Sequence, residues 1–160
     1  MTPSKADVLK GFIGKFRAER DSLVASAKAA HLAATHEESK AEDKHDTFAI
    51  ENSYLAAGQA ARVAEIEQTL LEFEQYAINT APHLQVGRGS YIAYRCDGSQ
   101  YLALITVLGG GTKLEVEGKS IQVISLKSPL GEEFESARPG DEFTLELRGT
   151  EKDYRLVEIA

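Results

Sequence analysis

A charged run in the N-terminal half carries the side chains best suited to metal or phosphate chemistry. Residues 36–46 hold five acidic residues and two lysines and almost nothing apolar. Asp43 and Asp46 stand three residues apart, and Glu42 precedes them. Carboxylate oxygens suit Mg²⁺, and carboxylates can also orient a water molecule. Acidic residues before a helix can equally cap its free N–H groups and favour its dipole, so both interpretations stay open.

The other residue types capable of chemistry do not form a recognisable catalytic pattern. The chain has no His-Glu-x-x-His run, no pair of histidines at i, i+4 and no Gly-x-Ser-x-Gly elbow. The single cysteine, Cys96, excludes a disulfide and a cysteine-based zinc site, and we expect it to be buried on a strand. We therefore predict no free-standing catalytic site and no cofactor of the protein's own. Surface positions are expected for the histidines, which are His31, His36, His45 and His83.

Composition limits the class of protein. Of 160 residues, 42% are hydrophobic and 27% charged, which is typical of a folded protein. Eighteen Lys and Arg against 25 Asp and Glu give a net charge of -7, which disfavours stand-alone DNA binding. No apolar run approaches the roughly 18 residues of a membrane span, and charged residues interrupt the N-terminus where a signal peptide would be apolar. We expect a cytoplasmic protein with no membrane partner.

The elements that must position the acidic run are two long helices. Ser4 followed by Asp7 resembles a capping box at the start of the first. Apolar residues then recur at helical spacing, and their size falls along the first helix and rises along the second. This mirror symmetry predicts an antiparallel helical hairpin with residues 36–46 at its tip. The two stripes are Leu9, Phe12, Ile13, Phe16, Leu23, Ala27, Ala30 and Ala34, and Ala56, Val63, Ile66, Leu70, Phe73 and Ala77.

The C-terminal half has a different pattern, which begins near Ala81-Pro82. Glycines become frequent, and β-branched and aromatic residues alternate with polar ones. We predict strands at 90–96, 101–107, 113–116, 119–125, 142–148 and 153–159, with a short helix or crossover at 128–134. The predicted class is α+β, with an antiparallel coiled-coil hairpin at 1–79 and a small antiparallel-sheet domain at 80–160.

Three C-terminal motifs carry a family resemblance. They are Ser128-Pro129-Leu130-Gly131, Pro139-Gly140-Asp141-Glu142-Phe143 and Tyr154-Arg155-Leu156-Val157-Glu158-Ile159. Their order and spacing resemble those of the bacterial GreA/GreB transcript-cleavage factors, in which an N-terminal coiled coil is joined to an FKBP-like C-terminal domain. The hairpin resembles the family in its length and in the stretch Arg62-Val63-Ala64-Glu65-Ile66-Glu67.

The resemblance implies a function in transcription. In this family the hairpin enters the secondary channel of RNA polymerase, where acidic tip residues help to hold Mg²⁺ and a water that cleaves backtracked RNA. The matching pair here is Asp43 and Asp46, with Glu42 as the alternative if the register shifts by one. The implied protein is not itself an enzyme but stimulates the polymerase's own RNA cleavage, with Mg²⁺ held by the polymerase and with only indirect DNA contact.

Departures from the family pattern leave two other functions open. Asp46 stands where the family has a glutamate, and the family sequence Glu-Asn-Ala-Glu-Tyr after the tip is missing. One alternative is a secondary-channel regulator that binds polymerase without promoting cleavage. A more distant alternative is an FKBP-type prolyl isomerase or chaperone, although the chain has no Trp and few aromatic residues to line such a pocket.

Overall fold

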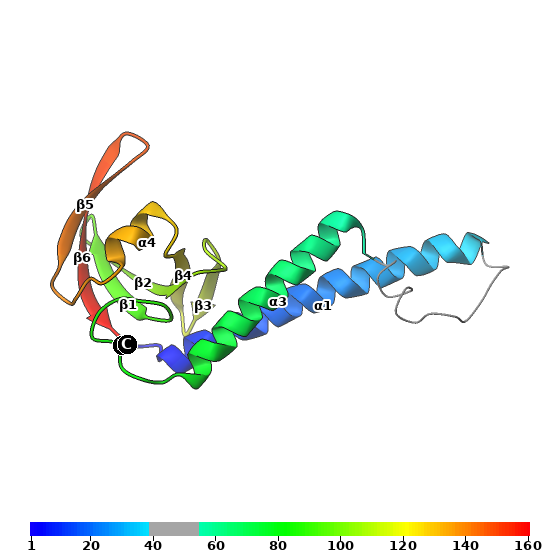
Figure 1. The fold of residues 1–160 in the computed structure, drawn as a ribbon, viewed down its shortest axis with the longest axis horizontal. Coiled ribbons are helices and arrows are strands. Elements are labelled where there is room, and N and C mark those ends of the chain that lie inside the picture. Colours follow the sequence, from blue (N-terminus) through cyan, green and yellow to red (C-terminus); the bar gives the residue numbers. More distant parts are fainter. Residues whose placement is uncertain (39–54) are drawn as a thin grey trace. The chain divides into compact units, whose positions relative to one another are not determined.

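The computed structural model describes residues 1–38 and 55–160, which form helices followed by a sheet (Figure 1). The helices are α1 (Lys5–Glu38), α3 (Ala57–Ile78) and the short α4 (Pro129–Phe134). The strands are β1 (Tyr91–Cys96), β2 (Ser99–Thr106), β3 (Lys113–Val116), β4 (Lys119–Ser125), β5 (Glu142–Leu147) and β6 (Thr150–Ile159). The predicted α+β class is confirmed. Among the described residues no helix is both long and apolar enough to span a membrane.

Ser4 caps the start of α1, as the sequence predicts. The backbone N–H of Asp7 donates to Ser4 Oγ at 3.2 Å, and the Ser4 hydroxyl donates to the Asp7 carboxylate at 2.5 Å. The first helical backbone bond runs from Val8 N to Ser4 O at 3.0 Å. These contacts satisfy free N–H groups at the helix start.

The chain divides into two compact units. One unit combines Met1–Ile13 with Leu71–Ala160, and the other is Gly14–Leu70. The first unit therefore contains the whole sheet together with the beginning of α1 and the end of α3. The division at 79 and 80 that composition suggests stays a prediction about domains.

The two long helices pair antiparallel in each unit. In the sheet-containing unit, the rings of Phe12 and Phe73 meet edge to face with centroids 5.8 Å apart. In the helical unit, Arg62 donates to Glu19 at 2.7 Å. Within the helical unit, α1 and α3 run side by side in opposite directions (Figure 1).

The buried seam between the helices is shorter than the apolar stripes predict. Residues buried in the seam or at its base are Val8, Leu9, Phe12, Phe16, Ala27, Val63, Ile66, Leu70 and Phe73. The prediction is wrong for four alanines of the two stripes, because Ala30, Ala34, Ala56 and Ala77 are all exposed. In the register set by Glu19 and Arg62, no described residue of α3 lies opposite Ala30 or Ala34, because α3 begins at Ala57.

Within the described residues, six strands form a mixed sheet in the order β3-β4-β2-β1-β6-β5. The expectation of a fully antiparallel sheet is wrong at one pair, because β2 and β4 run parallel from Leu102↔Ile121 to Thr106↔Ser125. The glycines at 109–111 make this crossover possible. Gly109 and Gly111 have φ of 76° and 86°, and a Cβ on Gly110 would lie 2.9 Å from Ser125 Cβ. Glycine suits all three positions.

The central strands of the sheet bury residues on both faces. One face packs under α4, with Phe134 fully buried against the ring of Tyr94 at 5.1 Å. Its other core residues are Val86, Ile92, Cys96, Ala103, Ile105, Ile124, Ala137, Tyr154 and Leu156. Residues that alternate with these along the strands, such as Tyr91 and Leu104, are also buried and so lie on the opposite face. The start of α1 covers that face near β3, where a Cβ on Gly11 would lie 2.6 Å from Leu114.

Candidate functional site

The predicted tip carboxylates follow α1 in the chain. Glu42, Asp43 and Asp46 lie within 39–54, outside the described residues. The structure describes the helices on either side, with α1 ending at Glu38 and α3 beginning at Ala57. The roles of these carboxylates therefore stay predictions. Among the residues that the structure does describe, no group of three or more His, Cys, Asp or Glu is arranged to hold a metal ion.

A charged cluster joins the two helices of the helical unit beside its apolar seam. The Arg62 guanidinium donates from Nη2 and Nε to one oxygen of Glu19 at 2.7 and 3.0 Å, and forms an ion pair of 3.1 Å with Glu65. The hydrogen bond to Glu19, supported by Glu65, raises the pKa of Arg62. Arg62 and Glu65 belong to the stretch that resembles the family, so this stretch has a structural role in joining α1 to α3.

The sequence motif at 128–131 builds the short helix α4. Ser128 Oγ accepts a hydrogen bond from the Gly131 N–H at 3.1 Å and donates to Ser125 O at 2.6 Å. Pro129 occupies the first helical turn, where its missing N–H is harmless. A Cβ on Gly131 would lie 1.9 Å from Ser125 O, so this position admits only glycine. Each residue type in the motif thus has a local structural reason.

A shallow groove of about 420 Å³ lies beside this motif. Exposed residues on its rim include Lys127, whose N–H donates to Ser125 Oγ at 3.2 Å. The groove is lined by Gly110, Gly111, Gln122, Val123, Ile124, Ser125, Lys127, Ser128 and Leu130. The crossover glycines and the family motif therefore meet at one surface, although they are far apart in the sequence.

The second family motif forms the turn that leads from α4 to β5. The Arg138 N–H donates to the Asp141 carboxylate at 2.8 Å, and Gly140 has a φ of 98°. Leu156 of β6 bonds to this turn in both directions, from Gly140 N to Leu156 O at 2.8 Å and from Leu156 N to Asp141 O at 2.9 Å. The motif therefore fixes β5 against β6.

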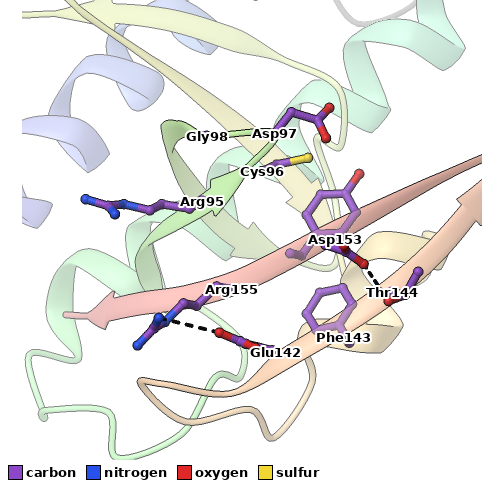
Figure 2. Close-up of a pocket in the computed structure, with 10 residues that line it drawn as sticks. Arg95, Cys96, Asp97, Gly98, Glu142, Phe143, Thr144, Asp153 and Arg155 are labelled. Carbon is purple, nitrogen blue, oxygen red and sulfur yellow. Dashed lines mark hydrogen bonds and ion pairs between the residues drawn. The ribbon is translucent and has the colours of Figure 1, made fainter.

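A second groove, of about 610 Å³, lies where β1, β6 and β5 run side by side (Figure 2). Two side-chain pairs join β5 to β6 in this groove. Arg155 contacts Glu142 at 3.5 Å, and Thr144 donates to Asp153 at 2.6 Å. The lining is Arg95, Cys96, Asp97, Gly98, Glu142, Phe143, Thr144, Asp153, Tyr154 and Arg155. Sequence analysis missed this groove, because only the strand register brings these residues together.

Cys96 is buried at the edge of that groove, as the sequence predicts, with 6% of its surface exposed. Burial raises the pKa of its thiol, and the negative charge of Asp97 acts in the same direction. A raised pKa disfavours the nucleophilic thiolate. Cys96 therefore contributes to the core and is not suited to nucleophilic chemistry.

The aromatic residues of the sheet pack against one another. Phe134 of α4 lies 5.0 Å from Phe143 and 6.4 Å from Tyr154 between ring centroids, and Phe143 stacks on Tyr154 at 5.3 Å. Phe134 is fully buried, and Tyr154 is 7% exposed. These rings form the core between α4 and the sheet.

Two of the histidines have side chains that the structure describes. His83 Nδ1 lies 3.0 Å from Ser90 Oγ, and burial lowers the pKa of His83, with a smaller effect from Lys5. His31 is half-buried on α1, so the expected surface location applies only in part. Nothing is described for the side chains of His36 and His45.

Comparison with known proteins gave solved structures only, because no protein-family model and no curated protein matches the chain. GreA factor homolog 1 of Thermus thermophilus is 17% identical with a TM-score of 0.36, covering 97% of this chain and 94% of that one. The Thermus aquaticus protein of the same name is 19% identical with a TM-score of 0.37, covering 98% and 95%. A GreA/GreB transcription elongation factor from Nitrosomonas europaea is 16% identical with a TM-score of 0.36, covering 66% and 96%. This chain is thus similar to structures named for the family that its motifs resemble.

Proposed function

We propose that the protein is a transcription elongation factor that binds RNA polymerase. The proposal rests on the three C-terminal motifs that resemble the GreA/GreB family, in the same order and spacing. The protein inserts its coiled coil into the secondary channel and stimulates cleavage of backtracked RNA. It acts in the bacterial cytoplasm and contacts DNA only indirectly.

The observation that supports this function best is the antiparallel pairing of α1 and α3. A helix of 34 residues is about 50 Å long at 1.5 Å per residue, and its partner pairs with it through Phe73 and Arg62. Asp43 and Asp46 follow the end of α1 by a few residues in the sequence. A helix of this length, paired along its first part with α3, is suited to carry a short acidic segment into a narrow channel.

In this role Asp43 and Asp46 supply carboxylate oxygens to a Mg²⁺ ion that the polymerase holds, with Glu42 as the alternative in a shifted register. Such an ion stabilises the attacking and leaving oxygens of a displacement at phosphorus. Two exposed carboxylates bind Mg²⁺ poorly on their own, because the ion dehydrates reluctantly. The protein therefore has no cofactor of its own and is not an enzyme without the polymerase.

The sheet-containing unit provides the surface that docks on the polymerase, and we place this surface at the groove beside Ser128 and Pro129. Lys127 and Pro129 are exposed there, while the backbone beneath them is fixed by the cap on α4. Rigid backbone with exposed side chains is favourable for binding, because little order has to be gained.

A pull-down of core RNA polymerase tests the binding function. The full chain should retain the polymerase, and Lys127→Glu should weaken retention because it reverses the exposed charge at the groove. Lys119→Glu, which makes the same charge change at an exposed position that does not line the groove, is the matched control. Failure of the wild-type chain to retain polymerase, or equal loss in both variants, would contradict the proposed docking surface.

The non-cleaving channel binder is the second candidate, and one observation favours it. Asp46 has one methylene less than the glutamate of the family, so its carboxylate reaches a shorter distance.

A prolyl-isomerase assay on a proline-containing peptide tests the more distant FKBP-type alternative, for which we expect no activity.

A further inference from the structure

The strand β5 lies at one end of the described sheet and pairs only with β6 there. Its first residues pack under α4 through the contact of Phe143 with Phe134, whose rings are 5.0 Å apart. Further along, Glu146 and Leu147 are exposed, and Leu147 keeps 38% of its surface accessible. An edge strand of this kind offers unpaired backbone N–H and C=O groups to another extended chain.

The opposite edge of the described sheet is less available. That edge is β3, which has only four residues. Its Leu114 packs against α1, since a Cβ on Gly11 would lie 2.6 Å from it. Short edges resist the addition of a further strand. The six residues of β5 are therefore the better template.

The two faces of β5 differ in chemistry. Successive side chains point to opposite faces of a sheet, so the acidic and hydroxyl residues Glu142, Thr144 and Glu146 share one face. Phe143, Leu145 and Leu147 share the other, and Phe143 and Leu145 are half-buried. A strand added beside β5 would meet alternating polar and apolar positions.

Negative charge on the polar face of β5 is only partly balanced. Glu142 lies opposite Arg155 of β6, with an ion pair of 3.5 Å. Glu146 lies directly opposite Glu151, and among the described residues neither of these two carboxylates has an ion-pair partner. Like charges opposite one another in a sheet are destabilising. A positive charge beside Glu146 would remove this repulsion.

We propose that the free edge of β5 binds an extended polypeptide segment in which basic and apolar residues alternate. Lysine or arginine of the segment lies beside Glu142 and Glu146, a small polar residue beside Thr144, and apolar residues beside Phe143, Leu145 and Leu147. Main-chain hydrogen bonds provide affinity, and the alternating side chains provide selectivity. This inference does not rest on polymerase binding, because it can be tested without the polymerase.

A second copy of the chain is a poorer occupant of the same edge in the register centred on Thr144. Symmetric antiparallel pairing of two β5 strands about Thr144 would place Glu142 of each copy opposite Glu146 of the other. Both contacts would bring like charges together at the edge. In this register the repulsion between the glutamates opposes self-association, whereas a basic partner would be attracted.

Binding of a short synthetic peptide to the full chain tests the proposal. The probe is the capped peptide Val-Lys-Val-Thr-Val-Lys, and the control probe has glutamate in place of both lysines. NMR titration should shift the amide signals of residues 142–147 with the lysine peptide. The variant Glu146→Lys should weaken that peptide roughly tenfold and improve binding of the glutamate peptide. Glu133→Lys, an equal charge change on exposed α4, should leave both affinities unchanged.

Methylation of the peptide backbone separates strand addition from simple charge attraction. Alternate N–H groups of a strand point to opposite edges, so one set faces β5 and the other faces solvent. One probe carries methyl groups on the valine nitrogens, and a second probe carries them on the other nitrogens. Only one of these two probes should lose binding to β5. Equal binding by both methylated probes, loss in both, no shift in β5, or dimerisation of the free chain through β5 would overturn the proposal.

Discussion

The Glu72 carboxylate accepts a hydrogen bond of 2.7 Å from the backbone N–H of Val107, and so ties α3 to the chain just after β2. The other carboxylate oxygen accepts from Leu108 N at 2.8 Å, and the Tyr76 hydroxyl also donates to Glu72. Burial and the neighbouring Glu72 together raise the pKa of Tyr76. One side chain therefore satisfies two backbone donors at the start of the crossover, which explains how a loop beside the sheet is held by a helix.

The variant Glu72→Gln should lower the free energy of unfolding by about 1–3 kcal/mol, because glutamine has a single acceptor oxygen and leaves one backbone N–H without a partner. Denaturant unfolding measures the change. Glu67→Gln, on the exposed surface of the same helix, is the control and should change stability by less than about 0.5 kcal/mol. Equal stability of the two variants would contradict a stabilising role for the hydrogen bonds from Val107 and Leu108 to Glu72.

Two adjacent leucines on α3 test the seam of the helical pair. Leu70 is 4% exposed and Leu71 is 64% exposed. Leu70→Ala should destabilise the protein by about 2–5 kcal/mol, since it leaves a cavity. Leu71→Ala should have little effect. Thermal unfolding of both variants compares them directly, and an unchanged midpoint for Leu70→Ala would show that the seam is not a packed core.

Replacement of two glycines by alanine should have opposite effects on stability, one set by a steric clash and the other by helix propensity. Gly131→Ala should cost about 3 kcal/mol or more, because its Cβ would meet the carbonyl of Ser125 at 1.9 Å. Gly14→Ala, in an open position on α1, should instead stabilise the protein by roughly 1 kcal/mol. Calorimetry measures whether each variant is less or more stable than wild type. An unchanged stability of Gly131→Ala would contradict the tight packing of α4 on Ser125.

We expect the free energy of unfolding to fall at alkaline pH because of Tyr91. Its buried hydroxyl has no hydrogen-bond partner within the described chain, and burial raises its pKa from 10.0 to about 12, with Glu158 adding to the effect. Because the pKa of Tyr91 is higher in the folded state, its contribution to the free energy of unfolding is complete below pH 10.0. That contribution is lost as the pH rises toward about 12. Denaturant unfolding across this range should show a smaller loss for Tyr91→Phe than for wild type. Identical pH profiles would contradict this assignment.

The local elements were predictable to the extent that turn chemistry marks them. The strands at 113–116 and 119–125 match β3 and β4, because the turn at Glu117-Gly118 defines the hairpin. The last strand begins at Thr150 rather than at 153, because the residues added are polar on both faces and give no alternation to read. Alternation reports which face a residue occupies but not which strand lies beside it, so the parallel pair of β2 and β4 was not predictable.

Candidate sites were less predictable than elements. The cap role of Ser128 could be read from the motif, but the groove that it shares with Gly110 depends on the crossover. The charged groove at Arg155 and Glu142 depends on strand register. Asp43 and Asp46 were chosen from residue type and family resemblance, and they lie outside the described residues, so their role is decided by experiment.

Cleavage of RNA in backtracked polymerase complexes tests the central proposal most directly. Wild-type protein should accelerate release of the RNA 3′ fragment, and the double variant Asp43→Asn, Asp46→Asn should reduce the rate to that of polymerase alone. Because asparagine caps helices about as well as aspartate, folding should be little changed. The pair Glu132→Gln, Glu133→Gln on α4 matches the charge change and should retain full activity. Cleavage at the wild-type rate by the asparagine variant, or no acceleration by wild type, would contradict the account and assign the acidic residues to helix capping.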